Sequence, residues 1–446
     1  MIPAADTIAA IATPAGRGGI GVVRVSGPRC AAIAQAIVGR VPAARHATRA
    51  DFRGDAGALI DQGLALFFPA PHSYTGEDVL ELQGHGGPVV MRELLRACTA
   101  CGARLAQPGE FTRRAFLNER IDLAQAESVA DLIDASSAEA ARSAVRSLAG
   151  DFSRGIHALV RALVELRMHV EACIDFPDEE VDVHDRESMR EQLVALVRAR
   201  DELAAQAKQG VVLRDGLTVV LVGPPNVGKS SLLNRLAGEE VAIVTPIPGT
   251  TRDLVRATVI LDGVPVHLVD TAGLREATDE VERIGIERAW QAIASAGAAI
   301  VLGDGAAGDD EEARIRARLP AELPVAHVRN KIDLEALAAA REDRGGNTAI
   351  RLSARTGEGV GHLRAWLLET AGWRPHGEGL FLARERHLVA LADAGRALDA
   401  ANGDIQAFEL VAEELRIAQV ALGRITGEVS ADELLGEIFG RFCIGK

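Results

Sequence analysis

The chain has 446 residues, of which 48% are apolar and 25% charged, the proportions of an ordinary globular protein with two to four domains. A formal net charge of −14 argues against a large sequence-independent nucleic-acid surface. Five cysteines do not form a disulfide scaffold and favour a reducing compartment. The start of the chain lacks the basic residues of a signal peptide, and no apolar run approaches membrane-spanning length, so we expect a soluble cytoplasmic protein without membrane association.

Residues 1–118 are predicted to form an α+β domain. Strand-like runs at 7–11, 22–26, 63–68 and 78–83 alternate with helical patterns at 29–38 and 89–101. Residues 16–21 fit the pattern G-x-G-x-x-G, but a strand follows them instead of a helix. That order favours a turn or a ligand-lining loop over a dinucleotide site.

Two features of this domain invite a metal or catalytic interpretation. Cys98 and Cys101 form a C-x-x-C pattern, but the pair lies on a predicted helix without a second cysteine pair, which favours packed thiols over zinc or redox chemistry. His85 stands among glycines in a predicted flexible loop, where a turn histidine is commoner than a general base.

Residues 119–213 and 373–446 share a composition rich in Ala, Leu, Arg and Glu at helical spacing. One long amphipathic helix is predicted to begin at Leu123, with others at 156–174, 189–208, 390–401, 405–422 and 431–440. The acidic stretch 175–187, broken by Pro177, reads as a solvated connector. The similarity predicts one helical bundle with residues 214–372 inserted in it; the alternative is two unrelated helical regions.

A phosphate-binding loop is predicted at residues 223–230, which read G-P-P-N-V-G-K-S. An apolar run at 217–222 precedes the loop and a helical pattern follows it, which is the context that the motif G-x-x-x-x-G-K-S requires. Backbone N–H groups in such a loop converge on an anion, and the helix N-terminus adds partial positive charge. Lys229 is expected to reach the β- and γ-phosphates and Ser230 to ligate Mg²⁺.

Three further motifs predict a guanine nucleotide. Asp270-Thr271-Ala272-Gly273 ends a second apolar run, where a carboxylate can support the Mg²⁺ shell. Asn330-Lys331-Ile332-Asp333 follows a third, and the Asp333 carboxylate can accept hydrogen bonds from guanine N1–H and N2–H₂, which adenine lacks. Ser353-Ala354 stands where a base-contacting loop is expected. In this order the motifs resemble the GTP-binding domain of translation-factor-like GTPases.

The chain as a whole resembles the MnmE (TrmE) family of tRNA uridine-modification GTPases. The motifs that carry the resemblance lie along its full length, at residues 12–19, 74–78, 81–87, 108–112, 122–127, 246–253 and 443–446. The last of these, Cys443-Ile444-Gly445-Lys446, ends the chain. Its final lysine argues against prenylation of Cys443, and no packing requirement places a cysteine there, so Cys443 is a candidate catalytic or redox thiol.

The resemblance implies a GTP-hydrolysing enzyme that works as a homodimer and as a heterotetramer with MnmG, a partner that uses FAD and NADH. Together they would form 5-carboxymethylaminomethyl or aminomethyl uridine at wobble position 34 of certain tRNAs. It also implies that the N-terminal domain mediates dimerisation and binds 5,10-methylenetetrahydrofolate or 5-formyltetrahydrofolate through Arg24, Glu81, Arg120 and Lys446. Position 120 is lysine in some relatives, so the charge is kept here but the geometry differs.

The resemblance assigns the nucleotide site residue by residue. It implies Mg²⁺ ligands at Ser230 and Thr251, and K⁺ ligands at Asn226, Thr245, Ile247 and Thr250. The expected GTP contacts are Asn226, Val227, Gly228, Lys229, Ser230, Ser231, Thr245, Pro246, Ile247, Pro248, Gly249, Thr250, Thr251, Asp270, Thr271, Ala272, Gly273, Asn330, Lys331, Asp333, Ser353 and Ala354.

Hydrolysis needs a group that positions water, and Leu274 stands where Ras-like proteins have a glutamine. The resemblance points to Glu282 for that task and to a K⁺ ion, with paired GTPase domains, for stabilising the transferred phosphoryl group. An arginine from Arg252 or Arg275 is the alternative cation. Two other functions compete: a ribosome-assembly switch, which would normally carry a basic RNA-binding module, and a regulatory switch without a substrate, which leaves the N-terminal domain and Cys443 unexplained.

Overall fold

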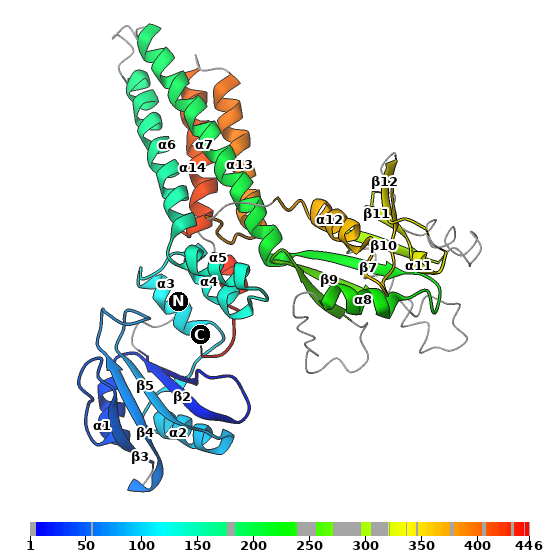
Figure 1. Cartoon of the computed structure of the whole chain (residues 1–446). Helices are drawn as coiled ribbons and strands as arrows, with labels where there is room; N and C mark the ends of the chain where they lie inside the picture. Colours follow the sequence, from blue (N-terminus) through cyan, green and yellow to red (C-terminus); the bar gives the residue numbers. More distant parts are fainter. Residues whose placement is uncertain are drawn as a thin grey trace, which may run out of the picture. The chain divides into compact units, whose positions relative to one another are not determined.

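In the computed structural model the chain forms two compact units, Met1–Ala130 with Gln419–Lys446, and Asp131–Ala418. Figure 1 shows the helices and strands along the chain. The structure describes residues 6–54, 57–175, 183–238, 256–270, 296–304, 320, 322–335, 337–344, 347–374, 379–403, 407–429, 432–440 and 442–445. The four domain ranges expected from the sequence stay predictions.

The first unit is built on a six-stranded sheet with strand order β3-β4-β5-β2-β1-β6. Its neighbouring strands are antiparallel, except that β6 runs parallel to β1. The strands are β1 (Ile8–Ile11), β2 (Gly18–Ser26), β3 (Thr48–Arg53), β4 (Leu59–Phe68), β5 (Val79–Gly86) and β6 (Arg104–Leu105). Alternate residues of β2 and β5, among them Val23, Val25, Leu80 and Leu82, form a core with α1 (Cys30–Val38) and α2 (Pro88–Ala100).

Short helices and the C-terminal tail complete this unit. α3 (Glu110–Leu117) packs against α15 (Asp432–Gly440), where the ring of Phe439 lies 6.4 Å from that of Phe116. After α15 the chain returns to β1, and Gly445 adopts a φ of 99° there. A Cβ atom at Gly445 would lie 2.5 Å from the carbonyl oxygen of Ile11, so only glycine fits this position.

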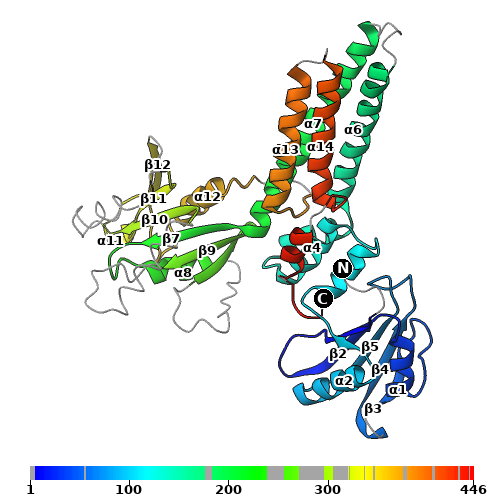
Figure 2. The same ribbon diagram turned by 180° about the vertical axis from the view of Figure 1, so that it is seen from behind.

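Helices form one part of the second unit: α5 (Ala138–Leu148), α6 (Asp151–Asp175), α7 (Val183–Asp215), α13 (Glu385–Gly403) and the first part of α14 (Phe408–Thr426), whose residues from Gln419 onward are counted with the first unit. α7 packs against both α6 and α13, and α14 runs beside α13 in Figures 1 and 2. Each of α6, α7 and α13 buries an apolar stripe, so the predicted bundle is present. α7 leads directly into β7 (Leu217–Val222), and the chain re-enters the bundle at α13.

The inserted part is a seven-stranded sheet with strand order β12-β13-β11-β10-β7-β9-β8. The five central strands are parallel, and β12 and β8 pair antiparallel at the two edges. Beyond β7 these are β8 (Arg256–Leu261), β9 (Val264–Asp270), β10 (Ala298–Gly303), β11 (Val325–Arg329), β12 (Ala340–Arg344) and β13 (Asn347–Arg351). The described helices are α8 (Lys229–Ala237), α11 (Ile332–Glu335) and α12 (Val360–Thr370).

One buried carboxylate joins the two connections between the bundle and the inserted sheet. Asp131 lies in α4 (Leu123–Asp134), and its Oδ1 accepts hydrogen bonds from Arg214 at 2.8 Å and from Arg384 at 2.7 Å. Arg214 shortly precedes β7, and Arg384 immediately precedes α13. The two guanidinium groups compensate the burial of the carboxylate.

Two local predictions are wrong. The helix that begins at Leu123 ends at Asp134, because the Ser137 hydroxyl accepts a hydrogen bond from Ala140 N–H and so begins a new helix, α5. His85 lies in β5, not in a flexible loop, because the ladder with β2 continues to Gly86 and Asp61 binds the histidine. The thiols agree with prediction: Cys98 is buried on α2 and Cys101 half-buried at its end, and both are free.

Candidate functional site

The phosphate loop joins β7 to α8 at the carboxyl end of the parallel sheet. Gly223 and Gly228 have φ values of 157° and 103°. A Cβ at Gly223 would lie 2.2 Å from the carbonyl oxygen of Leu302, and one at Gly228 would lie 2.3 Å from Asn330 Nδ2. Asn226 also has a positive φ, 62°, which an asparagine tolerates better than most residues. The loop is therefore held open in a form that larger side chains would disrupt.

Lys229, the first residue of α8, is held across the loop. Its ammonium group donates hydrogen bonds to the carbonyl oxygens of Gly223, at 2.7 Å, and Pro224, at 3.1 Å. The side chain is half-buried, and Ser230 and Ser231 beside it are exposed. A cation and a helix N-terminus thus face the same small space, which is suited to an anion such as a phosphate chain.

Asn330 connects the phosphate loop to the predicted base loop, residues 353–359, and we call this connection the Asn330 bridge. The residue is buried, its Nδ2 donates to the carbonyl oxygen of Val227 at 2.9 Å, and its Oδ1 accepts from Ala354 N–H at 2.9 Å. Because β11 lies two strands from β7, the contact between Asn330 and Val227 brings together residues that are 103 positions apart in the chain. The structure thus brings residues 226–231, 330 and 354 to one edge of the sheet.

Asp333 lies within this group of residues. Its Oδ1 accepts a hydrogen bond from Ser353 Oγ at 2.6 Å, and its Oδ2 lies 2.9 Å from Arg355 Nη2. The hydrogen bond from Ser353 and, more weakly, the charge of Arg355 lower the pKa of Asp333. An ionised carboxylate only accepts hydrogen bonds, so it complements two adjacent N–H donors of guanine. Lys331, with φ of 64°, pairs with Asp304 at 2.7 Å.

Several predicted nucleotide residues lie outside the described residues. Asp270 ends β9 beside Leu221 of β7, at the same sheet edge as the phosphate loop, and its backbone alone is described. The others belong to the two segments 239–255 and 271–295. They are Thr245, Pro246, Ile247, Pro248, Gly249, Thr250, Thr251, Arg252, Thr271, Ala272, Gly273, Leu274, Arg275 and Glu282.

In the first unit, the C-terminal tail contacts Arg24, a predicted folate residue that pairs with a second one, Glu81. Arg24 of β2 and Glu81 of β5 face each other across the sheet, and both Nε and Nη2 of Arg24 lie 2.9 Å from Glu81 Oε1. Arg24 Nη1 also donates to the carbonyl oxygen of Gly445 at 3.4 Å. Cys443 is exposed, and its carbonyl oxygen accepts a hydrogen bond from Gly109 N–H at 3.4 Å. Lys446 lies outside the described residues.

Two aromatic rings lie close to the Arg24 guanidinium. Its carbon lies 5.6 Å from the ring centre of Tyr74 and 5.8 Å from that of Phe111, within the range of a cation–π contact. The Tyr74 hydroxyl is 2.8 Å from Thr112 Oγ1, and burial raises the pKa of this tyrosine. Arg120 is exposed, and its aliphatic stem passes close to Gly76 on the loop that carries Tyr74. Arg24, Glu81, Tyr74 and the tail form what we call the Arg24 corner.

A network of charged side chains, with Arg114 and Glu110 buried at its centre, supports this loop. Arg114 contacts Asp6 at 2.7 Å, Glu110 at 3.0 Å and Glu77 at 3.1 Å, and Arg104 also pairs with Asp6 and Glu110. Burial opposes ionisation of Asp6 and Glu110, but the arginine hydrogen bonds and charges outweigh it and lower the pKa of both carboxyls. The network ties the 74–78 loop to the start of α3.

Sequence reasoning did not assign a role to Tyr74, Arg235 or Arg355. Tyr74 belongs to the family motif at residues 74–78. Its contact with Arg24 forms only because the fold brings the loop of Tyr74 next to strand β2, which the sequence does not show. Arg235 and Arg355 follow the phosphate and base motifs closely, so their nearness to these motifs was the available signal.

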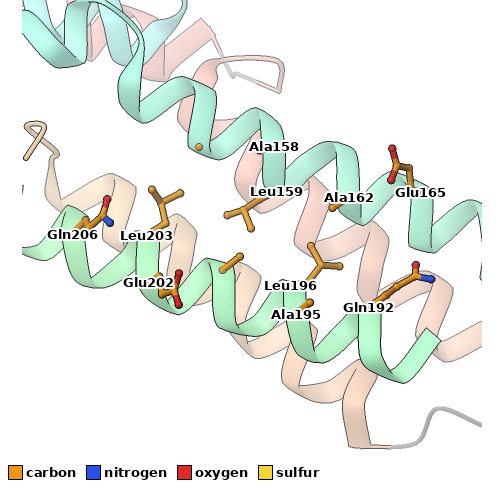
Figure 3. Close-up of a pocket in the computed structure, with 12 residues that line it drawn as sticks. Ala158, Leu159, Ala162, Glu165, Gln192, Ala195, Leu196, Glu202, Leu203 and Gln206 are labelled. Carbon is orange, nitrogen blue, oxygen red and sulfur yellow. The ribbon is translucent and has the colours of Figure 1, made fainter. Parts of the chain in front are cut away.

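A hollow between α6 and α7 is separate from the predicted site residues (Figure 3). It measures about 690 Å³ and is formed where small side chains of the two helices face each other. Its lining consists of Gly155, Ala158, Leu159, Ala162, Glu165, Gln192, Ala195, Leu196, Ala199, Glu202, Leu203 and Gln206. None of these belongs to the predicted nucleotide or folate residues.

The phosphate loop, the Asn330 bridge and the parallel sheet define a multidomain protein with a P-loop GTPase-like domain. The family model described as GTP-binding protein TrmE N-terminus matches residues 7–120, and the model of the MnmE helical domain matches residues 123–443. The chain belongs to the MnmE family of tRNA modification GTPases, and the family resemblance seen in the sequence is confirmed.

Named relatives are similar over the full length. The tRNA modification GTPase MnmE of Neisseria meningitidis serogroup C (strain 053442) is 59% identical over 443 residues, 99% of each chain. That of Thiobacillus denitrificans (strain ATCC 25259 / T1) is 58% identical over 445 residues, 100% of this chain and 99% of the relative. No described helix is long and apolar enough to cross a membrane.

Among solved structures, the G domain of the T. maritima FeoB iron transporter matches 35% of this chain and 98% of its own, at 26% identity and a TM-score of 0.28. A point variant of Aquifex aeolicus Era bound to GDP·AlF4⁻ matches 41% and 66%, also at 26% identity and a TM-score of 0.28.

Proposed function

We propose that this tRNA modification GTPase uses two chemically distinct sites, a guanine-nucleotide site in the inserted domain and a folate site at the Arg24 corner. The observation that carries the proposal is the contact between Arg24 and the carbonyl of Gly445, which seats the C-terminal tail beside the Arg24–Glu81 pair. A GTPase that acted only as a switch would not need this arrangement. An enzyme that modifies tRNA, in contrast, would need a cofactor site such as the Arg24 corner.

At the nucleotide site, Lys229 and the loop N–H groups would bind the phosphates, and Asp333 would accept the two guanine donors. Mg²⁺ fits the exposed Ser230 hydroxyl at the start of α8, with Thr251 as the second protein ligand. K⁺ prefers neutral oxygen ligands, and the positive-φ Asn226 presents an amide in the loop, with Thr245, Ile247 and Thr250 completing the set. Glu282 would position the attacking water.

At the Arg24 corner, the guanidinium and the Glu81 carboxylate offer donors and acceptors side by side, a pattern suited to the polar edge of a pterin. Arg120 and Lys446 would add positive charge for a carboxylated tail. The bound group, 5,10-methylenetetrahydrofolate or 5-formyltetrahydrofolate, would supply one carbon. Cys443, exposed and adjacent, is the proposed thiol of the reaction.

The substrate is proposed to be the wobble uridine at position 34 of certain tRNAs, converted to its 5-carboxymethylaminomethyl or aminomethyl form. The chain would act as a homodimer and in a heterotetramer with MnmG, whose FAD and NADH supply the redox chemistry. The predicted cytoplasmic location fits a tRNA substrate. Potassium would activate GTP hydrolysis when two inserted domains pair across the nucleotide.

The test of the modifying function is mass spectrometry of tRNA wobble uridines from a deletion strain complemented with the full chain or with a chain lacking residues 443–446. We expect the truncated chain to leave the uridines unmodified while its purified form still hydrolyses GTP. Normal levels of modified uridine with the truncated chain would rule out a chemical or binding role for the tail.

The test of potassium activation is GTP turnover in KCl and in NaCl at equal ionic strength. Asn226→Ala should abolish the difference in GTP turnover between the two salts, and Glu282→Ala should abolish turnover itself. Arg252→Ala and Arg275→Ala should retain both the turnover and its dependence on potassium. Equal rates in both salts, together with one inactive arginine variant, would favour an arginine as the catalytic cation.

A further inference from the structure

Arg235 connects the helix that begins at the phosphate loop with the predicted base loop. It lies in the last turn of α8, is half-buried, and its Nε donates to the carbonyl oxygen of Ala354 at 3.1 Å. Its Nη2 donates to the next carbonyl oxygen, that of Arg355. One rigid guanidinium therefore holds two successive carbonyls, which a more flexible side chain could not do with the same geometry.

Fixing these carbonyls also fixes the N–H groups that follow them. In a trans peptide the C=O and the next N–H point in opposite directions, so Arg235 sets the planes of the 354–355 and 355–356 peptides. Thr356 N–H donates to Ser353 Oγ at 3.1 Å, and Ser353 Oγ donates to Asp333 at 2.6 Å. A continuous series of bonds thus runs from Arg235 to the carboxylate that would read guanine.

The Asn330 bridge does not replace this connection. Asn330 holds Ala354 through its N–H group, whereas Arg235 holds Ala354 through its carbonyl. The base loop is therefore held at both backbone polar groups of Ala354. Asn330, just after β11, binds its N–H group, and Arg235 of α8 binds its carbonyl oxygen. Two further bonds, from Ser353 N–H to the carbonyl oxygen of Glu358 and from Gly357 N–H to that of Ser353, are internal to the loop. The side chains of Ser353 and Arg355 connect the loop to Asp333 but not to α8.

We propose that Arg235 is a positioning residue that determines guanine specificity. By tying α8 to the base loop, it keeps the loop and Asp333 at the distance from the phosphate loop that a guanosine phosphate requires. The inference rests on the proposed function of Asp333. It predicts that Arg235 acts on the binding of the base and not on the transfer of the phosphoryl group.

The experiment measures the dissociation constants of GDP and ADP for the full chain by competition with a fluorescent GDP analogue. Loss of two hydrogen bonds from a partly exposed arginine should weaken GDP binding of Arg235→Ala about tenfold. ADP does not engage Asp333 and should bind as before, so the ratio of the ADP to the GDP dissociation constant falls. The KM for GTP should rise with kcat unchanged, because the base contacts are the same in the ground and transition states.

Two variants serve as controls. Arg235→Lys keeps one donor within reach of a carbonyl and should recover part of the lost GDP affinity. Arg341→Ala removes an arginine of the same domain whose partners, Asp343 and Glu369, lie outside the 353–359 loop. It should leave the ratio of the two dissociation constants unchanged.

Equal weakening of GDP and ADP by Arg235→Ala, or a fall in kcat, would show that Arg235 only supports the fold and would overturn the inference. Asp333→Asn separates this outcome from failure of the proposed base site. If Asp333→Asn shifts the preference toward xanthine nucleotides while Arg235→Ala leaves the ratio unchanged, the inference alone fails. If Asp333→Asn retains the preference for guanine, the base site and the inference fail together.

Discussion

The two proposed ligand sites are built in opposite ways. In the inserted domain, each functional group belongs to a short motif that follows a parallel strand, such as Lys229 after β7 and Asn330 after β11. In the Arg24 corner, single residues come from distant parts of the chain, and Arg24 bonds to Gly445, 421 positions away. The first kind of site can be recognised in a sequence because its chemistry is local, whereas the second exists only once the chain has folded.

The comparison implies that the two sites can be disabled separately. Lys229→Ala should have the largest effect, because it removes the cation at the phosphate loop, and we expect GTP turnover to fall by about a hundredfold or more. The affinity for a tetrahydrofolate derivative should be unchanged. Turnover is measured by phosphate release and folate affinity by titration calorimetry. A matching loss of folate affinity would show that the two sites are not independent.

Gly445→Ala should disable the Arg24 corner. The φ of 99° disfavours any side chain, and the new Cβ would lie 2.5 Å from the carbonyl oxygen of Ile11, so the tail must leave its seat on β1. We expect folate affinity to fall by about tenfold, the loss of a contact worth about 1.4 kcal/mol, with GTP turnover intact. Gly436→Ala in α15 is the control, because a Cβ there meets nothing within 4 Å. Unchanged folate binding in Gly445→Ala would remove the tail from the site.

Arg24→Lys tests whether the corner needs a guanidinium or only a positive charge. Lysine keeps the charge but lacks the planar group that places two donors on Glu81 while staying within cation–π distance of Tyr74 and Phe111. We expect a loss of folate affinity of about threefold to tenfold, corresponding to about 1 kcal/mol. Titration of both proteins at the same ionic strength measures it. If Arg24→Lys binds as well as the parent protein while Arg24→Ala does not, charge alone is sufficient.

The smallest expected effect concerns the charges that support the corner. The pKa values of Asp6 and Glu110 are lowered in the folded chain, from ordinary values of 3.8 and 4.5. Their ionised forms therefore stabilise the fold at neutral pH, and this contribution is lost as the pH falls through the lowered folded-state values. Thermal unfolding of the first unit should shift downward below about pH 4.5, by a few degrees.

Glu110→Gln is the control for this pH dependence, since it removes one of the two titrating carboxyls. The variant should be less stable than the parent at neutral pH but lose less stability on acidification. Parallel curves for the two proteins between about pH 7 and about pH 3.5 would show that the network does not contribute to acid stability.

The sequence alone predicted four of the seven described strands of the inserted sheet, β7, β9, β11 and β13, but not β8, β10 or β12. Apolar runs predicted these strands, and the residues that follow the runs supplied the predicted nucleotide-binding motifs. The helical segments on both sides also indicated the bundle, because amphipathic spacing is a local property. The break at Ser137 was missed, since capping competes with helix continuation and the outcome depends on one hydrogen bond.

Tertiary structure alone decided the rest. His85 joined a strand because β2 and Asp61 were there to pair with it, which its glycine neighbours did not indicate. Arg24 met Tyr74 and Gly445, and Arg235 met Ala354 and Arg355, because sheet order and chain return brought their segments together. A sequence determines the local conformations and the chemical groups available. Which of these groups meet depends on the packing of elements far apart in the chain, and no local pattern records that packing.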